Sequence, residues 1–142
     1  MAEAAVSYVL HKLADALLKK GEELHDVRGK MEQMQLELGF IKANLRDADS
    51  KQHKGNELVK EWVNRVRDMA YNIEDVIDTF LVEIEENNPK SNSLLSRMLP
   101  VVKHPKLMNK LSVKLKEITQ NLKRIYQRGT DLGIKDLGAD LQ

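Results

Sequence analysis

The stretch Leu24–Ala48, LHDVRGKMEQMQLELGFIKANLRDA, decides the fold of this chain. Apolar residues recur along it in alternating steps of three and four, which is the pattern of a helix that packs a seam against other helices. They are Leu24, Val27, Met31, Met34, Leu38, Ile41, Leu45 and Ala48. The pattern predicts a helix over 22–49. Its interior glycines, Gly29 and Gly39, each cost about 1 kcal/mol relative to alanine, so this helix needs packing partners.

The same spacing predicts three more helices, over 3–20, 57–86 and 106–128. Each carries one apolar stripe. The members are Val6, Val9, Leu10, Leu13, Ala14 and Leu17 in helix 3–20, Trp62, Val66, Met69, Ala70, Ile73, Ile77, Phe80 and Ile84 in helix 57–86, and Met108, Leu111, Leu115, Ile118, Leu122 and Ile125 in helix 106–128. We expect Gly21 and Gly129 to end helices, since glycine favours the backbone conformation that follows a last turn. The polar residues 50–56 are expected to form a loop, with Asn56 capping the next helix.

All three prolines of the chain lie in the 20-residue connection 87–106, where residues 94–99 are spaced for one short helical turn. A connection this long is unusual in a compact bundle. The predicted fold is therefore all-α: a four-helix bundle over 1–128 with a long loop between the third and fourth helices, and a tail or linker over 129–142. An intermolecular coiled coil would use the same seams, and the spacing leaves that alternative open.

Composition narrows the class of protein. The chain has 142 residues, enough for one domain, with 42% hydrophobic, 4% aromatic and no cysteine residues. Few aromatics disfavour a β-sandwich or barrel, and the lack of cysteine excludes disulfides and thiolate metal sites. No apolar run reaches the roughly 18 residues of a membrane span, and no signal peptide or myristoylation site is present at the N-terminus.

The sequence does not point to an enzyme. The four histidines lie far apart, no nucleophile elbow occurs, and the glycine spacing of Gly133 and Gly138 lacks the lysine of a phosphate loop. Residues 87–128 carry ten basic residues and one acid. This stretch has one aromatic residue and no recognition motif, so we expect no nucleic-acid partner. We likewise expect no metal and no cofactor in this domain.

Two predicted helix surfaces carry side chains that a helix facing only water does not require. On the third predicted helix Glu74, Asp75 and Asp78 lie on one outer face beside Tyr71 and Val82, which is typical of a docking surface for a basic partner. The other interpretation is a solvated acidic face.

The first predicted helix is apolar almost all round at its start. Residues 4–11 have no fixed charge, and Tyr8 and Leu18 lie off the main apolar face. Such a helix is either deeply buried in the bundle or made to leave it and meet lipid or a neighbouring chain.

The residues Glu74, Asp75, Val76, Ile77 and Asp78 reproduce a known motif letter for letter. They resemble the EDVID motif of the N-terminal coiled-coil domain of Rx-type plant immune receptors, the nucleotide-binding, leucine-rich-repeat (NLR) proteins. The opening MAEAAVSYVL of residues 1–10 is similar to that family's MADA motif, with Glu3 in place of aspartate. Residues 36–49 and 62–73 resemble its second and third helices, and the similarity spans about 1–128.

The resemblance implies a four-helix bundle that signals defence. In the family the EDVID acids contact arginines of the receptor's own repeat domain, and the tail would lead to a nucleotide-binding domain that holds ADP or ATP. The resting receptor would be cytoplasmic. On activation it would self-associate into a ring whose first helices enter the plasma membrane as a cation-permeable pore and cause hypersensitive cell death. The rival function is a soluble interaction module that recruits a partner or helper receptor and never inserts.

The resemblance also implies roles for further residues. The membrane helix would use Val6, Tyr8, Val9, Leu10, Leu13, Leu17 and Leu18. Glu3 and Asp15 are the acids available to line a pore, because His11 stands where some members have an acidic residue. Contacts with an anionic membrane surface would come from Lys103, Lys106, Lys110 and Lys114.

Overall fold

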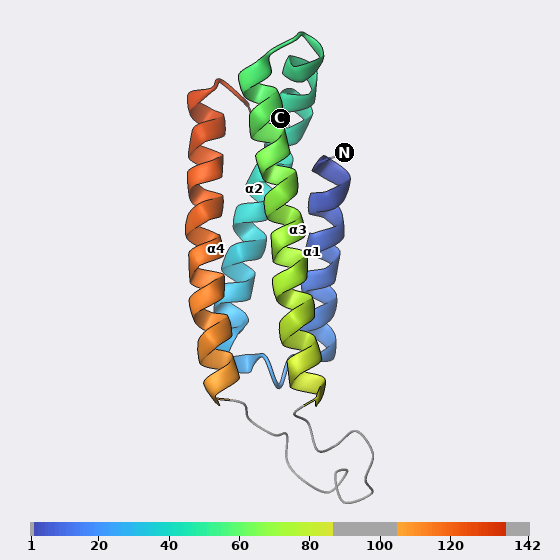
Figure 1. Ribbon diagram of the computed structural model, residues 1–142, viewed down its shortest axis with the longest axis vertical. Helices are drawn as coiled ribbons and strands as arrows, with labels where there is room; N and C mark the ends of the chain where they lie inside the picture. The colour runs from blue at the N-terminus through green and yellow to red at the C-terminus, as the bar shows by residue number, and fades with distance from the viewer. Residues whose placement is uncertain (1, 87–104, 136–142) are drawn as a thin grey trace, which may run out of the picture.

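Four long helices make up the described part of the chain. The computed structural model describes residues 2–86 and 105–135. The helices are α1 (Ala2–Lys19), α2 (Arg28–His53), α3 (Glu57–Glu86) and α4 (Pro105–Asp131), and a short 3-10 helix, η1 (His25–Val27), precedes α2. They run alternately up and down (Figure 1). The predicted all-α, four-helix architecture is confirmed. The expected helical turn at 94–99 and the loop around it lie outside the described residues.

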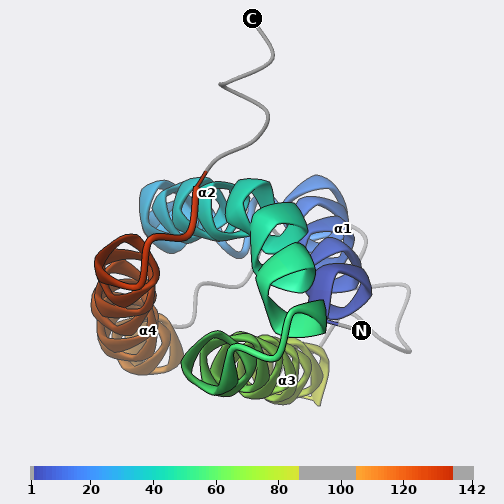
Figure 2. The same ribbon diagram turned by 90° about the horizontal axis from the view of Figure 1, so that it is seen from above.

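Seen from its end, the bundle places one helix at each corner (Figure 2). α1 packs beside α2 and α3, and α4 packs beside the same two helices, so α1 and α4 lie diagonally opposite each other. This topology makes α1 and α3 parallel neighbours (Figure 1). The N-terminal helix therefore has one flank against α2, one against α3, and an outer face turned to solvent.

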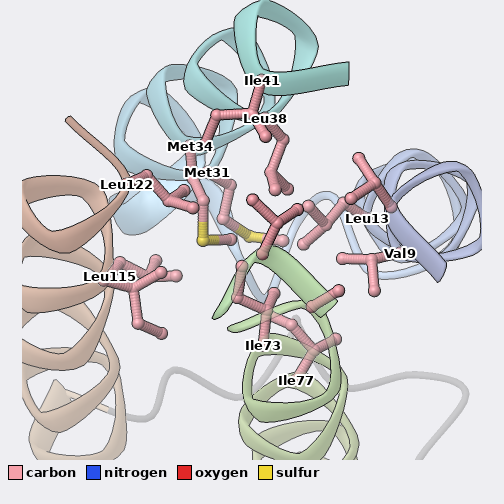
Figure 3. Close-up of a cluster of buried hydrophobic side chains, with 14 of the residues drawn as sticks. Val9, Leu13, Met31, Met34, Leu38, Ile41, Ile73, Ile77, Leu115 and Leu122 are labelled. Atoms are coloured by element: carbon pink, nitrogen blue, oxygen red, sulfur yellow. The ribbon is translucent and has the colours of Figure 1, made fainter. Parts of the chain in front are cut away.

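The predicted seams form the core. Every seam residue from Leu24 to Ala48 is buried, as are the stripe residues of α4 and most of those of α3. Figure 3 shows side chains from all four helices meeting at the centre, among them Val9, Met34, Ile73 and Leu115. Because each buried aliphatic side chain contributes about 1.5–3 kcal/mol, this apolar core is the main source of stability.

The ends of the second predicted helix differ from expectation. The prediction of one helix over 22–49 is wrong at both ends, because residues 25–27 form η1 and α2 begins at Arg28 and continues to His53. Leu24 and Val27 stay buried through this irregular turn. Residues 50–53, expected in a loop, form the last turn of α2. Asn56 does cap α3: its Oδ1 accepts a hydrogen bond of 3.2 Å from the backbone N–H of Val59.

The expected helix stop at Gly129 is also wrong. Gly129 is buried inside α4, where it packs against the indole of Trp62. The helix ends instead at Asp131 and is closed by Gly133, whose φ of 82° lies in the left-handed region. The N–H of Gly133 donates to the carbonyl of Thr130, and the N–H of Ile134 to that of Gly129. This bonding is the Schellman pattern of helix C-termini.

The residues after α4 belong to the bundle rather than to a free tail. Ile134 is buried in the core. The backbone N–H of Lys135 donates a 2.8 Å hydrogen bond to Oδ2 of Asp47 on α2, which Lys51 Nζ also contacts at 2.9 Å. Burial opposes ionisation of Asp47, but these two donors outweigh it and hold the pKa of its carboxyl below the ordinary value. Residues 129–135 are thus tied to α2, and 136–142 lie outside the described residues.

Candidate docking surface on α1 and α3

The inner face of α1 anchors it to the bundle. Val6, Val9, Leu13 and Leu17 are buried and Leu10 is partly buried, as the spacing predicts. Ala14 is an exception: it is exposed, and the sequence interpretation that placed it on the main face is wrong. At 100° per residue Ala14 lies a full step away from Leu13, beyond the edge of the buried arc.

The outer face of α1 carries apolar side chains that are exposed to solvent. Tyr8 is 54% exposed and Leu18 83% exposed. Glu3 and Asp15 are exposed on the same helix, and Asp15 pairs with Lys19 at 3.3 Å, one turn further on. Both apolar residues therefore lie off the main face, as the sequence indicated.

The EDVID residues divide between core and surface. Ile77 is buried, and Val76 is partly buried against the core. Glu74 and Asp78 lean toward α1, where Lys12 Nζ lies 3.6 Å from Oε1 of Glu74 and 2.6 Å from Oδ1 of Asp78. Asp75 is exposed and forms no ion pair with any described residue. The three acids thus do not form one free surface, since only Asp75 is unengaged.

A second ion pair joins the residue that follows α1 to the last turn of α3. Lys20 Nζ lies 2.7 Å from Oε2 of Glu85. We call these contacts, of Lys12 with Glu74 and Asp78 and of Lys20 with Glu85, the α1–α3 clamp. All of these side chains are partly exposed, and a solvated ion pair contributes only about 0–1 kcal/mol. The clamp therefore orients α1 on α3, while the buried apolar face supplies most of the attachment.

Lys12 is the centre of this clamp. Its hydrogen bond to the Asp78 carboxylate raises the pKa of its ammonium, burial opposes that rise, and the charges of Asp78, Tyr8 and Glu74 add to it. The ammonium also lies 5.5 Å from the ring centroid of Tyr8, a cation–π distance. Since the folded pKa is raised, the stability from Lys12 is complete at neutral pH and is lost only as the pH rises above the ordinary lysine range.

Removing the two engaged acids should separate their role from that of Asp75. Glu74→Gln with Asp78→Asn is expected to lower the free energy of unfolding by about 1 kcal/mol, because Lys12 loses both partners. The matched variant Asp75→Asn should change it by less than about 0.5 kcal/mol, as expected at a surface site. Urea unfolding measures both, and the difference should shrink at about 1 M salt because the contacts are solvated. Equal effects of the two variants would contradict the conclusion that Glu74 and Asp78 are engaged by Lys12 while Asp75 is not.

Three of the four lysines proposed to meet an anionic surface are described. Lys106, Lys110 and Lys114 recur every four residues along α4 and are all exposed, while Lys103 lies outside the described residues. None of the described helices combines the length and apolar composition that a membrane crossing requires. Within residues 2–86 and 105–135 no group of three acidic or histidine side chains is arranged to hold a metal ion.

The fold and this surface define an all-helical domain of the coiled-coil class. Residues 5–106 match the family model described as the Rx N-terminal domain. That match covers more than half of the chain, so the chain belongs to the Rx N-terminal domain family, the N-terminal coiled-coil domains of plant NLR disease resistance proteins. This is not a known enzyme family.

Individual relatives agree with the family. The chain is 32% identical over 137 residues to At1g50180 of Arabidopsis thaliana, a protein named for disease resistance, which covers 96% of this chain and 16% of that protein. It is 30% identical over 90 residues to the disease resistance protein RPP13 of Arabidopsis thaliana, covering 63% and 11%. For the disease resistance protein Pik-2 of Oryza sativa subsp. japonica the identity is 30% over 88 residues, covering 61% and 9%. The chain spans about a sixth or less of these relatives. No solved structure matches it.

Proposed function

We propose that this domain executes the defence response of a plant immune receptor. On activation it oligomerises and inserts α1 into the plasma membrane as a cation-permeable pore that triggers hypersensitive cell death. At rest it would lie in the cytoplasm, packed against the receptor's own nucleotide-binding and leucine-rich-repeat domains. The domain would need no cofactor, and ADP or ATP would bind the nucleotide-binding domain. Family membership and the MADA-like opening of the chain support this proposal.

The two-sided apolar character of α1 is the observation that carries the proposal. Its inner face is buried, while Tyr8 and Leu18 stay largely exposed to solvent at rest. Apolar side chains on both sides of a helix suit an environment other than the resting bundle.

Energetics also favour α1 as the element that leaves. The clamp contributes at most a few kcal/mol, because every pair in it is partly exposed. The larger cost of release is exposure of buried side chains such as Val6, Val9 and Leu13, at about 1.5–3 kcal/mol each. A bilayer or the α1 helices of neighbouring copies would cover these residues again, so activation would exchange one apolar environment for another.

One observation favours the rival function, a soluble interaction module. Asp75 is unpaired among the described residues, and the neighbouring Tyr71 and Val82 are about half exposed. An acid beside exposed apolar groups suits a basic partner surface, either the receptor's own repeat domain or a helper receptor. Arginines reaching Glu74 or Asp78 would share these carboxylates with Lys12.

Expression of the 142-residue chain in leaf cells tests the two functions. If the domain executes the response, the chain is expected to cause cell death without any other receptor domain and to appear in the plasma-membrane fraction as an oligomer. Soluble, monomeric chain that causes no cell death at matched abundance would contradict the proposal and favour the interaction module.

Attraction of α4 to anionic lipid gives a separate expectation. Each lysine near an anionic leaflet contributes about 1 kcal/mol. Changing Lys106, Lys110 and Lys114 to glutamine should therefore weaken binding to anionic vesicles, and raising the salt should weaken the wild type similarly. The matched control replaces the same number of exposed lysines on other faces, Lys30, Lys54 and Lys60. Equal losses in both variants would remove any specific role for the α4 lysines.

A further inference from the structure

A groove runs between the start of α3 and the end of α4, which meet at one end of the bundle (Figure 1). It encloses about 300 Å³. Its lining combines apolar side chains with one acid and three bases: Leu58, Trp62, Leu132, Glu61, Arg65, Arg124 and Arg128. We call it the α3–α4 groove. Its lining shares no residue with the α1–α3 clamp.

The three arginines of the groove have no acidic partner among the described residues. None of them forms an ion pair within residues 2–86 and 105–135, and Arg124 donates only to Oδ1 of Asn121, at 3.2 Å. Arg128 lies in the last turn of α4, where a cation favours the helix dipole. That local effect does not account for Arg65, which lies far from either end of α3.

The apolar part of the groove is partly open and rigid. Leu58 is 56% exposed at its edge, and Leu132 is partly buried. The side chain of Trp62 is fixed in place, because its Nε1 donates a 2.7 Å hydrogen bond to the carbonyl of Ile125 and its ring lies against Gly129. A floor that is already ordered loses little entropy when a ligand binds.

We propose that the α3–α4 groove binds an acidic segment of a protein partner. Carboxylates of the segment would pair with Arg65, Arg124 and Arg128, and an apolar side chain would pack on Leu58 and Leu132. Guanidinium groups suit carboxylates because their planar donors can bind both oxygens. The hollow shape and the leucines favour a protein segment over a membrane, whose headgroup surface offers no apolar side chain to fill the groove. The proposal is independent of pore formation.

Trp62 makes the groove directly observable, because it is the only tryptophan in the chain. The probe is a synthetic capped peptide of alternating acid pairs and leucines, Glu-Asp-Leu-Glu-Asp-Leu-Glu-Asp. Titration into the 142-residue chain is expected to change the Trp62 emission to saturation. The comparison peptide replaces each leucine with serine and keeps the charge, and it should bind more weakly if the leucines pack in the groove.

Charge-reversal variants locate the binding site. Arg124→Glu with Arg128→Glu should weaken binding of the leucine peptide by at least about tenfold, as for loss of a charge-assisted contact. The matched control, Lys110→Glu with Lys114→Glu, makes the same charge change elsewhere on α4 and should weaken it less than about threefold. Circular dichroism and thermal unfolding establish that both variants are folded. The variant Leu58→Ser, at an exposed site, should also weaken binding of the leucine peptide.

Four results would overturn the proposal. The first is no saturable change with the leucine peptide. The second is equal binding of the serine peptide, and the third is an equal loss in the lysine variant, since either would indicate non-specific attraction. The fourth is a change in Trp62 emission that is caused by anionic vesicles, or by concentrating the protein alone, and not by the peptide. This change would also have to disappear in the arginine variant. That result would assign the groove to lipid or to a second copy.

Discussion

Replacing Tyr8 and Leu18 together with glutamate should abolish cell death in leaf cells and leave the bundle folded. Both side chains point to solvent at rest, so the free energy of unfolding should change by no more than about 1 kcal/mol in total. A charge at the centre of a bilayer costs roughly 2.5–3.5 kcal/mol on insertion scales, and each copy of α1 would carry two added charges at different depths. The cost is multiplied by the number of copies in a ring, so pore formation should fail completely.

The matched control uses two exposed apolar residues on other helices. Leu36 on α2 is 52% exposed and Val113 on α4 is 53% exposed. Leu36→Glu with Val113→Glu adds the same charge and should leave cell death intact. Abundance, circular dichroism and membrane fractionation of both variants accompany the cell-death assay. If the Tyr8 and Leu18 variant is folded, reaches the membrane and kills at the wild-type rate, the pore proposal fails.

Gly129→Ala is expected to destabilise the bundle, although it adds only a single methyl group. A Cβ at this position would lie 2.9 Å from Cε2 and Cζ2 of Trp62 and 3.0 Å from its Nε1. A Cβ atom essentially never lies less than 3.0 Å from another heavy atom, and the hydrogen bond to Ile125 restrains the ring from moving aside. Overpacking of this kind costs about 1–3 kcal/mol, more than the advantage of alanine over glycine inside a helix. Urea unfolding followed by Trp62 fluorescence measures the loss.

Gly39→Ala is the control for that experiment. An added Cβ there meets no atom within 4 Å, so the variant should gain up to about 1 kcal/mol from helix propensity alone. The two variants make the same chemical change in two helices and should differ in sign. Similar effects in both would show that the close approach of Gly129 to Trp62 has no energetic consequence.

The core could be predicted because it depends on a local rule. A residue that recurs every three or four positions returns to the same face of a helix, so the seam from Leu24 to Ala48 identified its buried members without knowledge of their partners. The EDVID motif and the family were equally readable, since a motif is a property of consecutive residues. The exposure of Tyr8 and Leu18 followed from the same angular reasoning.

Two of the errors concern residues whose role depends on a partner distant in sequence. Gly129 looks like a helix stop in sequence, yet its use is to accommodate Trp62 from another helix. Glu74 and Asp78 appeared to share a free face with Asp75, but they meet Lys12 of α1. The acid-rich end of α3 and the lysines of α1 were visible in the sequence, and only their side-by-side placement was missing.

The amino-acid sequence by itself determined the number of helices, the residues that fill the core and the family, because periodicity and motifs are carried by neighbouring residues. Only the tertiary structure decided which charges are neutralised, where α4 ends and which arginines gather around the exposed Leu58. The physical reason is that ion pairs and close packing act over a few ångströms in space. Helix spacing sets the face on which a side chain lies, but the arrangement of the four helices sets what it meets there.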